Sequence, residues 1–122
     1  MTITNAIERA DRSAPNNYTS ADKIRWLSLL DGRIKQEIID RHEGAQAVVF
    51  TEYGDDVERE LLVPAPYDEL YLHWLCAMIY YAGGEIARYN NALARFDEDY
   101  KAFAKKYTSE HMPRATGKRF LF

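Results

Sequence analysis

The sequence predicts an all-α fold: a small bundle of about four helices around a long C-terminal helix, with a short β-hairpin or extended loop near residues 46–63 and an extended C-terminal tail. The main observation is an apolar stripe whose members are separated by steps of three and four residues, which helices can use and strands cannot. Two shorter amphipathic segments also begin at residues that cap helices. The stripe consists of Leu72, Leu75, Ile79, Ala82, Ile86, Tyr89, Leu93, Phe96, Tyr100, Phe103 and Tyr107.

The stretch from Pro66 to Tyr107 carries this stripe and is expected to be helical. Pro66 suits a first helical turn, where its missing N–H has no intrahelical partner to lose. Gly83 and Gly84 are the weak point, because each costs about 1 kcal/mol relative to alanine inside a helix. The stripe keeps its phase across this pair, which favours one continuous or kinked helix over two separate helices.

The N-terminal part predicts two further helices. Residues 2–12 form a short amphipathic helix that Thr2 or Thr4 can cap, and a turn follows at residues 13–17. The second helix is expected to begin with Ser20 as its cap and to run to about Arg41. Its apolar side consists of Ile24, Leu27, Leu30, Ile34 and Ile38.

The segment from His42 to Val63 differs in composition from the helices that flank it. Residues 47–50 and 60–63 are short and rich in β-formers, and residues 53–56 between them are typical of a turn. Residues 52–60 hold five acidic side chains against one arginine, so the turn region is strongly acidic. The Pro-Ala-Pro sequence at residues 64–66 predicts an extended entry into the long helix.

Length and composition indicate one helical domain over residues 1–109, with residues 110–122 as an extended tail. The formal net charge of −3 gives no general signature of nucleic-acid binding. Residues 1–12 are polar and include acidic side chains, so no secretory signal is expected. The longest uncharged apolar run is about half of the ~20 residues that a spanning helix needs, so no membrane partner is expected.

Residue types that carry chemistry do not cluster in the sequence. His42, His73 and His111 are widely separated and lack metal-site spacing, so we expect no metal and no cofactor. Cys76 lies three residues after His73 and could neighbour it, but nothing supplies an oxyanion hole, and a buried structural cysteine is favoured. We therefore expect that the protein is not an enzyme.

The aromatic residues of the long helix exceed what a chain of this size can cover, so part of that face is expected to contact another subunit. The acidic loop and the basic tail have opposite charge, which suits head-to-tail contacts that close into rings. Candidate intersubunit or neck contacts are Glu52, Tyr53, Asp55, Asp56, Tyr80 and Tyr81. The candidate docking tail contains Arg114, Lys118, Arg119, Phe120 and Phe122.

Three stretches resemble small proteins encoded in the head-morphogenesis region of bacterial prophages. In size and helical order they are similar to the head–tail connector (adaptor) proteins of long-tailed double-stranded DNA phages. The resemblance begins at Ala21 and extends over nearly all of the chain that follows. It is carried by Leu61-Leu62-Val63-Pro64-Ala65-Pro66-Tyr67-Asp68-Glu69-Leu70-Tyr71, by Gly84-Glu85 with Arg88-Tyr89-Asn90-Asn91, and by His111-Met112-Pro113.

The resemblance implies a structural virion protein of the phage neck, assembled in the host bacterial cytoplasm. Its copies would form a homo-oligomeric ring, typically a dodecamer, on the portal protein, with DNA passing transiently and without sequence specificity through the channel. Mapped by position, Arg114–Phe122 would reach the portal, and the loop at residues 46–60 would meet a downstream neck or tail-completion protein. Many adaptors break between their third and fourth helices, whereas the stripe here favours no break. The alternative is a small prophage-encoded DNA- or protein-binding regulator.

Overall fold

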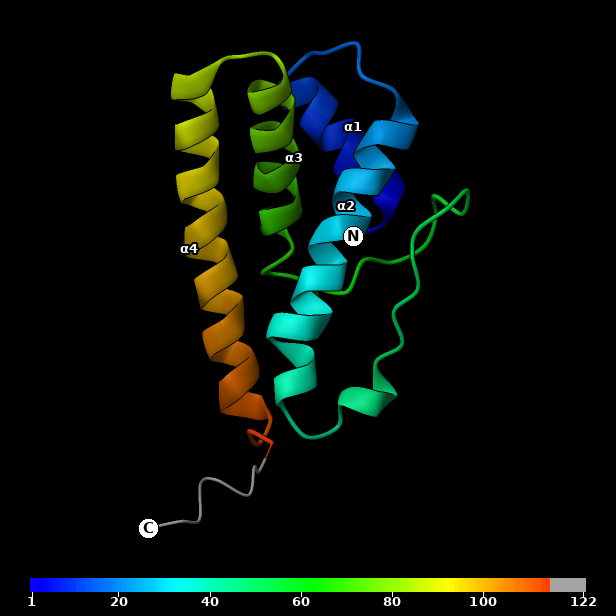
Figure 1. Cartoon of the computed structure of the whole chain (residues 1–122), viewed down its shortest axis with the longest axis vertical. Coiled ribbons are helices and arrows are strands. Elements are labelled where there is room, and N and C mark those ends of the chain that lie inside the picture. The colour runs from blue at the N-terminus through cyan, green and yellow to red at the C-terminus, as the bar shows by residue number, and fades with distance from the viewer. Residues whose placement is uncertain (115–122) are drawn as a thin grey trace.

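The computed structural model describes residues 1–114, which form a bundle of α-helices without a β-strand in that range (Figure 1). α3 lies at the centre, with α4 on one side and α1 and α2 on the other. The predicted all-α class with a long C-terminal helix is therefore confirmed. The α-helices are α1 (Ile3–Ser13), α2 (Ser20–Glu37), α3 (Glu69–Ala82) and α4 (Ile86–Glu110), and two short 3₁₀ helices are η1 (Ile39–Arg41) and η2 (Ala45–Ala47).

Side-chain caps fix the starts of the first two helices. The Thr2 hydroxyl accepts the backbone N–H of Asn5, whose side chain in turn bonds the Thr2 backbone in a capping box. α2 is capped by Thr19, one residue before the predicted cap Ser20. The α-helix ends at Glu37 rather than near Arg41, and the chain then tightens into η1, which buries Ile39.

α3 and α4 are two antiparallel helices, so the expectation of one continuous or kinked helix is wrong. Gly84 has a φ of 74°, in the left-handed region that favours glycine. Its N–H bonds the Tyr81 carbonyl at 3.1 Å, and the Glu85 N–H bonds the Tyr80 carbonyl at 2.9 Å. These bonds satisfy carbonyls at the end of α3 and reverse the chain. α3 also begins at Glu69, so Pro66 precedes the helix.

The apolar stripe stays in phase across this reversal because both helices of the hairpin direct apolar side chains toward a shared core. Leu75 and Ile79 in α3, and Phe96 and Phe103 in α4, are buried. At the turn the stripe leaves the core, since Ile86 is 54% exposed. The three- and four-residue spacing of the apolar stripe therefore identifies the buried face of each helix, but it does not show that the two helices are continuous.

The connection between α2 and α3 contains η1 and η2 and then runs as an extended loop. An extended loop was one of the two forms predicted near residues 46–63, and the other form, a β-hairpin, is absent from the described residues. The loop packs along the start of α1: the N–H groups of Ile3 and Thr4 bond the carbonyls of Arg59 and Val57 at 3.1 and 2.9 Å. An isolated bridge joins Thr2 and Glu60. The N-terminal helix thus supplies the backbone partners that a second strand would have supplied.

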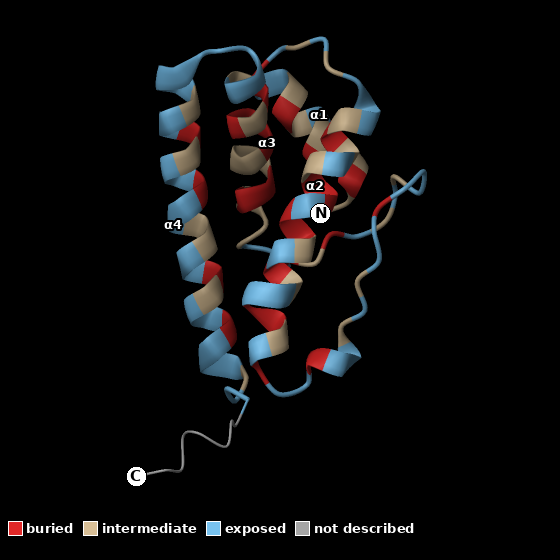
Figure 2. Cartoon of the chain, viewed as in Figure 1, coloured by how far each residue is buried: buried red, intermediate tan, exposed pale blue. Residues whose placement is uncertain are grey.

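The core lies where α1, α2 and α3 meet, and the buried positions of all four helices face inward (Figure 2). Val63 brings the end of the loop into the same core, where it is fully buried. Burying each such aliphatic side chain stabilises the fold by roughly 1.5–3 kcal/mol. The largest fully buried apolar side chains are Tyr71, Ile3, Leu27, Leu30, Ile34, Leu70, Leu75 and Val63.

A pair of glycine substitutions tests the helical hairpin. Replacing Gly84 with alanine is expected to lower the free energy of unfolding by about 1 kcal/mol, because alanine is strained at positive φ. Gly83 has a φ of −85°, and an added Cβ would lie 3.5 Å or more from its neighbours, so Gly83→Ala should change stability little. Urea unfolding measures both. If both substitutions raised stability by about 1 kcal/mol, as in a helix interior, the hairpin would be contradicted.

Candidate interaction surfaces

A buried carboxylate holds the α2–α3 loop against the bundle. Asp31 of α2 is fully buried and accepts hydrogen bonds from the Tyr53 hydroxyl, from the Tyr71 hydroxyl at 2.6 Å and from the Leu62 N–H at 3.1 Å. The Tyr71 hydroxyl in turn accepts the Val63 N–H at 2.8 Å. The carboxylate therefore joins α2, two parts of the loop and α3 in one network.

Burial sets the ionisation properties of this network. It raises the pKa of Asp31, and the three hydrogen bonds to the carboxylate oppose that rise. Burial and the neighbouring Asp31 carboxylate raise the pKa of both Tyr53 and Tyr71, so both hydroxyls remain protonated donors. Within residues 1–114 no buried side-chain nitrogen or oxygen lacks a hydrogen-bond partner. The network is a satisfied structural core.

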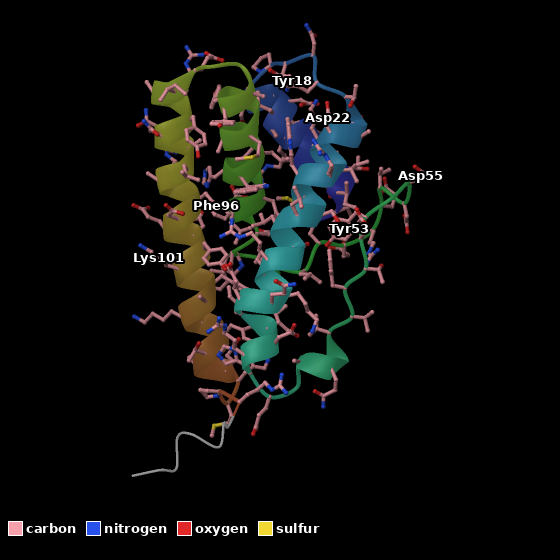
Figure 3. The ribbon with its side chains drawn as sticks, in the orientation of Figure 1. Tyr18, Asp22, Tyr53, Asp55, Phe96 and Lys101 are labelled. Atoms are coloured by element: carbon pink, nitrogen blue, oxygen red, sulfur yellow. The ribbon has the colours of Figure 1, made fainter. Side chains whose placement is uncertain are left out.

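The loop presents its acidic side chains outward from this anchor. Glu52, Asp55 and Asp56, three of the predicted contact residues, are exposed. Figure 3 shows Asp55 at the outer end of the loop and Tyr53 closer to α2. Tyr53 is only 7% exposed, and its hydroxyl bonds Asp31. Its predicted role as an intersubunit contact is therefore corrected: its side chain belongs to the core of the monomer.

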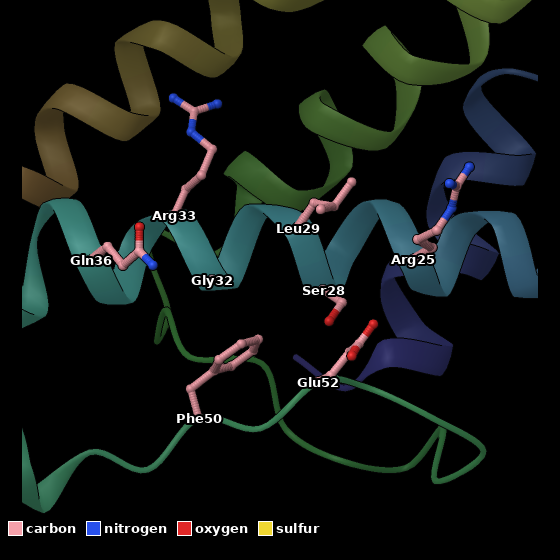
Figure 4. Close-up of a pocket in the computed structure, with 8 residues that line it drawn as sticks. All are labelled: Arg25, Ser28, Leu29, Gly32, Arg33, Gln36, Phe50 and Glu52. Carbon is pink, nitrogen blue, oxygen red and sulfur yellow. The ribbon is translucent and has the colours of Figure 1, made fainter.

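A groove lies between the outer side of α2 and the loop (Figure 4). Its volume is about 360 Å³. The Phe50 ring points from the loop toward Gly32, where an added Cβ would stand 3.6 Å from the ring. Leu29, which also lines the groove, is 58% exposed, so the groove combines apolar contact area with charged walls. The lining residues are Arg25, Ser28, Leu29, Gly32, Arg33, Gln36, Phe50 and Glu52.

A second apolar surface is the hairpin tip, residues 80–89, where α3 turns into α4. Tyr81 is 61% exposed, and its ring lies 5.1 Å from that of Tyr89. The Arg88 guanidinium lies 5.9 Å from the Tyr80 ring centre and pairs with Glu85 at 3.1 Å. Of the two predicted contact tyrosines, Tyr81 is thus exposed, and Tyr80 is half-buried at the same tip.

The base of the C-terminal tail is bonded to η1 and to the residues that follow it. The Glu43 N–H bonds the Met112 carbonyl, and the Arg114 N–H bonds the Arg41 carbonyl, both at 2.8 Å. Next to this joint, Nε2 of the buried His42 ring is hydrogen-bonded to the Thr108 hydroxyl at 2.9 Å. Arg114 also donates to the Asp40 carbonyl at 3.0 Å. The other predicted docking residues, Lys118, Arg119, Phe120 and Phe122, lie outside the described residues.

Groups suited to catalysis or metal binding do not converge in the described chain. His73 bonds Asp99 at 2.7 Å. Cys76 is buried, and burial raises the pKa of its thiol to about 11, which leaves it a poor nucleophile at neutral pH. Residues 1–114 hold no group of three or more potential metal ligands, and none of their helices is long and apolar enough to cross a membrane.

Comparison of the chain with models of protein families, with curated proteins and with solved structures finds no match in any of the three.

Sequence reasoning missed Asp31 and the groove. The signal for Asp31 is its place between Leu27 and Ile34 on the buried side of α2, where an acid needs buried donors. The sequence indicates the groove more weakly, since Leu29 lies beside the apolar side of α2 and Phe50 is distant from it in sequence. Only the folded loop brings them together.

The network predicts a large stability loss for Asp31→Asn. The amide presents a donor where the carboxylate accepted one, so at least one buried donor loses its partner, at a cost of about 2–3 kcal/mol. Urea unfolding measures the change. Asp97→Asn, on the exposed side of α4, is the matched control and should change stability by less than about 0.5 kcal/mol. Equal effects of the two variants would reject the network's structural role.

The raised pKa of Asp31 also predicts a pH dependence. A carboxyl that holds its proton more tightly when folded makes stability fall as pH rises from the ordinary value of 3.8 through the raised one. Other groups titrate alike in wild type and Asp31→Asn, so the wild-type advantage in unfolding free energy should be largest at acid pH and shrink above 3.8. Urea unfolding of both proteins across this range provides the test. An advantage that grows with pH would mean a lowered pKa instead.

Proposed function

We propose that this chain is a structural subunit of the neck of a long-tailed double-stranded DNA phage. Its copies form a homo-oligomeric ring on the portal protein, and DNA passes through the ring. The observation that carries the proposal is the helix order: α2, a long connecting loop, α3, then a break at Gly83 and Gly84 before α4. A break between the third and fourth helices is a feature of the adaptors that the sequence resembles.

The distribution of charge supports head-to-tail association. The acidic side chains of Glu52, Asp55 and Asp56 extend from the loop, which the Asp31 network anchors. Lys118 and Arg119, in the sequence that follows the joint at residues 111–114, carry the opposite charge. Opposite charges on separate parts of one chain attract successive copies, and such contacts close into a ring when the rotation permits.

The tail is the proposed portal-docking element, and the acidic loop is the proposed contact for the next neck protein. The joint at residues 41–43 and 112–114 supports the first assignment, because it holds residues 112–114, which directly precede the proposed docking residues in the sequence. The basic residues and Phe120 of the tail combine charge with an apolar anchor. DNA contacts in the channel are transient and need no base readout.

Portal binding tests this function. The full chain is mixed with portal rings of the phage that encodes it, and negative-stain imaging and mass photometry are expected to show one added ring per portal. Deleting residues 115–122 keeps the described joint at Arg114 intact and is expected to abolish portal binding.

The matched comparison uses two charge-neutralised variants. Lys118→Gln with Arg119→Gln is expected to weaken portal binding at least tenfold, as desolvated charge pairs do. Lys101→Gln with Lys105→Gln removes the same charge from the exposed side of α4 and should leave binding unchanged. A chain that ignores portals and shifts DNA as a dimer would instead support the prophage regulator.

A further inference from the structure

Two unpartnered apolar surfaces lie on separate parts of the same chain: the α2–loop groove and the hairpin tip. We infer that the hairpin tip of one copy docks in the groove of the next copy. The inference rests on the proposed ring and supplies its subunit contact. It identifies the surface that Tyr81 contacts, whereas the excess of aromatic residues indicates only that some contact exists.

The groove has the character of a contact site that lacks its partner. Leu29 exposes 58% of its surface on α2, and Phe50 is half-buried opposite Gly32. The loop that forms one wall is held by Asp31 through Tyr53 and Leu62. A preformed wall lowers the entropy that binding must offset.

The hairpin tip has the composition of an interface anchor. Tyr81 and Ile86 are 61% and 54% exposed, although both are large apolar side chains. The Tyr89 ring packs against that of Tyr81, and the Arg88 guanidinium lies over the Tyr80 ring at the same tip. Tyrosine and arginine dominate the residues that carry most binding energy at protein interfaces. The Gly84 turn places this group at an end of the bundle, where a neighbouring subunit can reach it (Figure 1).

Each of the two surfaces carries charges of both signs, so the docked copies can adopt an orientation in which unlike charges meet. The tip carries Glu85 and Arg88, whose side chains are 48% and 68% exposed. The groove wall carries Arg25 and Arg33 on α2 and Glu52 on the loop. With Tyr81 seated in the groove, Arg88 would exchange its partner Glu85 for Glu52. Glu85 would then turn to Arg25 of α2, because Arg33 already pairs with Glu37. Such matching fixes the orientation of a contact and disfavours others.

The two surfaces differ, so the contact is heterologous: each copy uses its tip on one neighbour and its groove on another. A patch that fits a pocket elsewhere on the same molecule produces chains of copies, which close into rings when the rotation permits. A symmetric pairing of tip with tip would stop at a dimer. A copy with a substituted tip and a copy with a substituted groove should therefore still associate with each other through the intact surface of each.

Complementation between two variants is the test. Tyr81→Ser with Ile86→Ser damages the tip and keeps the groove, whereas Leu29→Arg blocks the groove and keeps the tip. All three positions are more than half exposed, and circular dichroism with thermal unfolding checks that both variants fold. Each variant alone should self-associate at least tenfold more weakly than the wild type, whose NMR signals should shift with concentration.

Mixing the two variants should restore one contact and form a one-to-one pair. With the tip-damaged variant isotopically labelled, adding the groove-blocked variant is expected to shift the NMR signals of Leu29, Phe50 and Glu52. Met112→Ser changes an apolar side chain that is 68% exposed outside both surfaces, and it should self-associate like the wild type.

Several outcomes would overturn the inference. They are a wild-type chain without concentration-dependent shifts, a tip-damaged variant that still assembles, or a mixture without groove shifts. If deleting residues 115–122 abolished the NMR shifts of the groove residues, the C-terminal segment would be the occupant of the groove in place of the hairpin tip. Portal binding is scored separately, so copies that associate through tip and groove but ignore portals would reject the proposed function and keep this contact.

Discussion

The buried carboxylate of Asp31 is the constraint on which the arrangement of the loop depends. Its oxygens accept bonds from Tyr53, Leu62 and Tyr71, which come from two parts of the loop and from α3. A buried acceptor that loses its donors carries the full cost of desolvation, so the loop cannot leave α2 without a large penalty. One polar residue thus converts a long connection without strands into a fixed wall of the groove.

Much of the helical architecture could be predicted because local chemistry encodes it. The Thr2 cap, the break at residues 13–17 and the change of character after His42 are each written in a few neighbouring residues. The apolar spacing predicts one helix across Gly83 and Gly84, because this spacing is the same along one helix and along two helices that share a core. The stronger local signal was the Gly-Gly pair itself, which provides a left-handed C-cap.

The candidate surfaces were predictable only in part. Exposed acids in the loop and Tyr81 followed from composition, whereas the burial of Tyr53 did not, because it depends on Asp31, which lies far away in sequence. Leu29 and Phe50 line one groove only because the loop is held against α2. The groove and the acidic loop share Glu52, whereas the hairpin tip and the tail joint lie on other parts of the bundle.

The most direct test of this account is hydrogen exchange at single amides of the native chain, because its central claim is that the Asp31 network fixes the loop. The account predicts that the amides of Tyr53, Leu62 and Val63 exchange slowly, near the rate of global unfolding, while those of Gly54 and Asp55 exchange freely. Exchange of Leu62 and Val63 as fast as that of Asp55 would contradict it, since the loop would then open without unfolding the bundle.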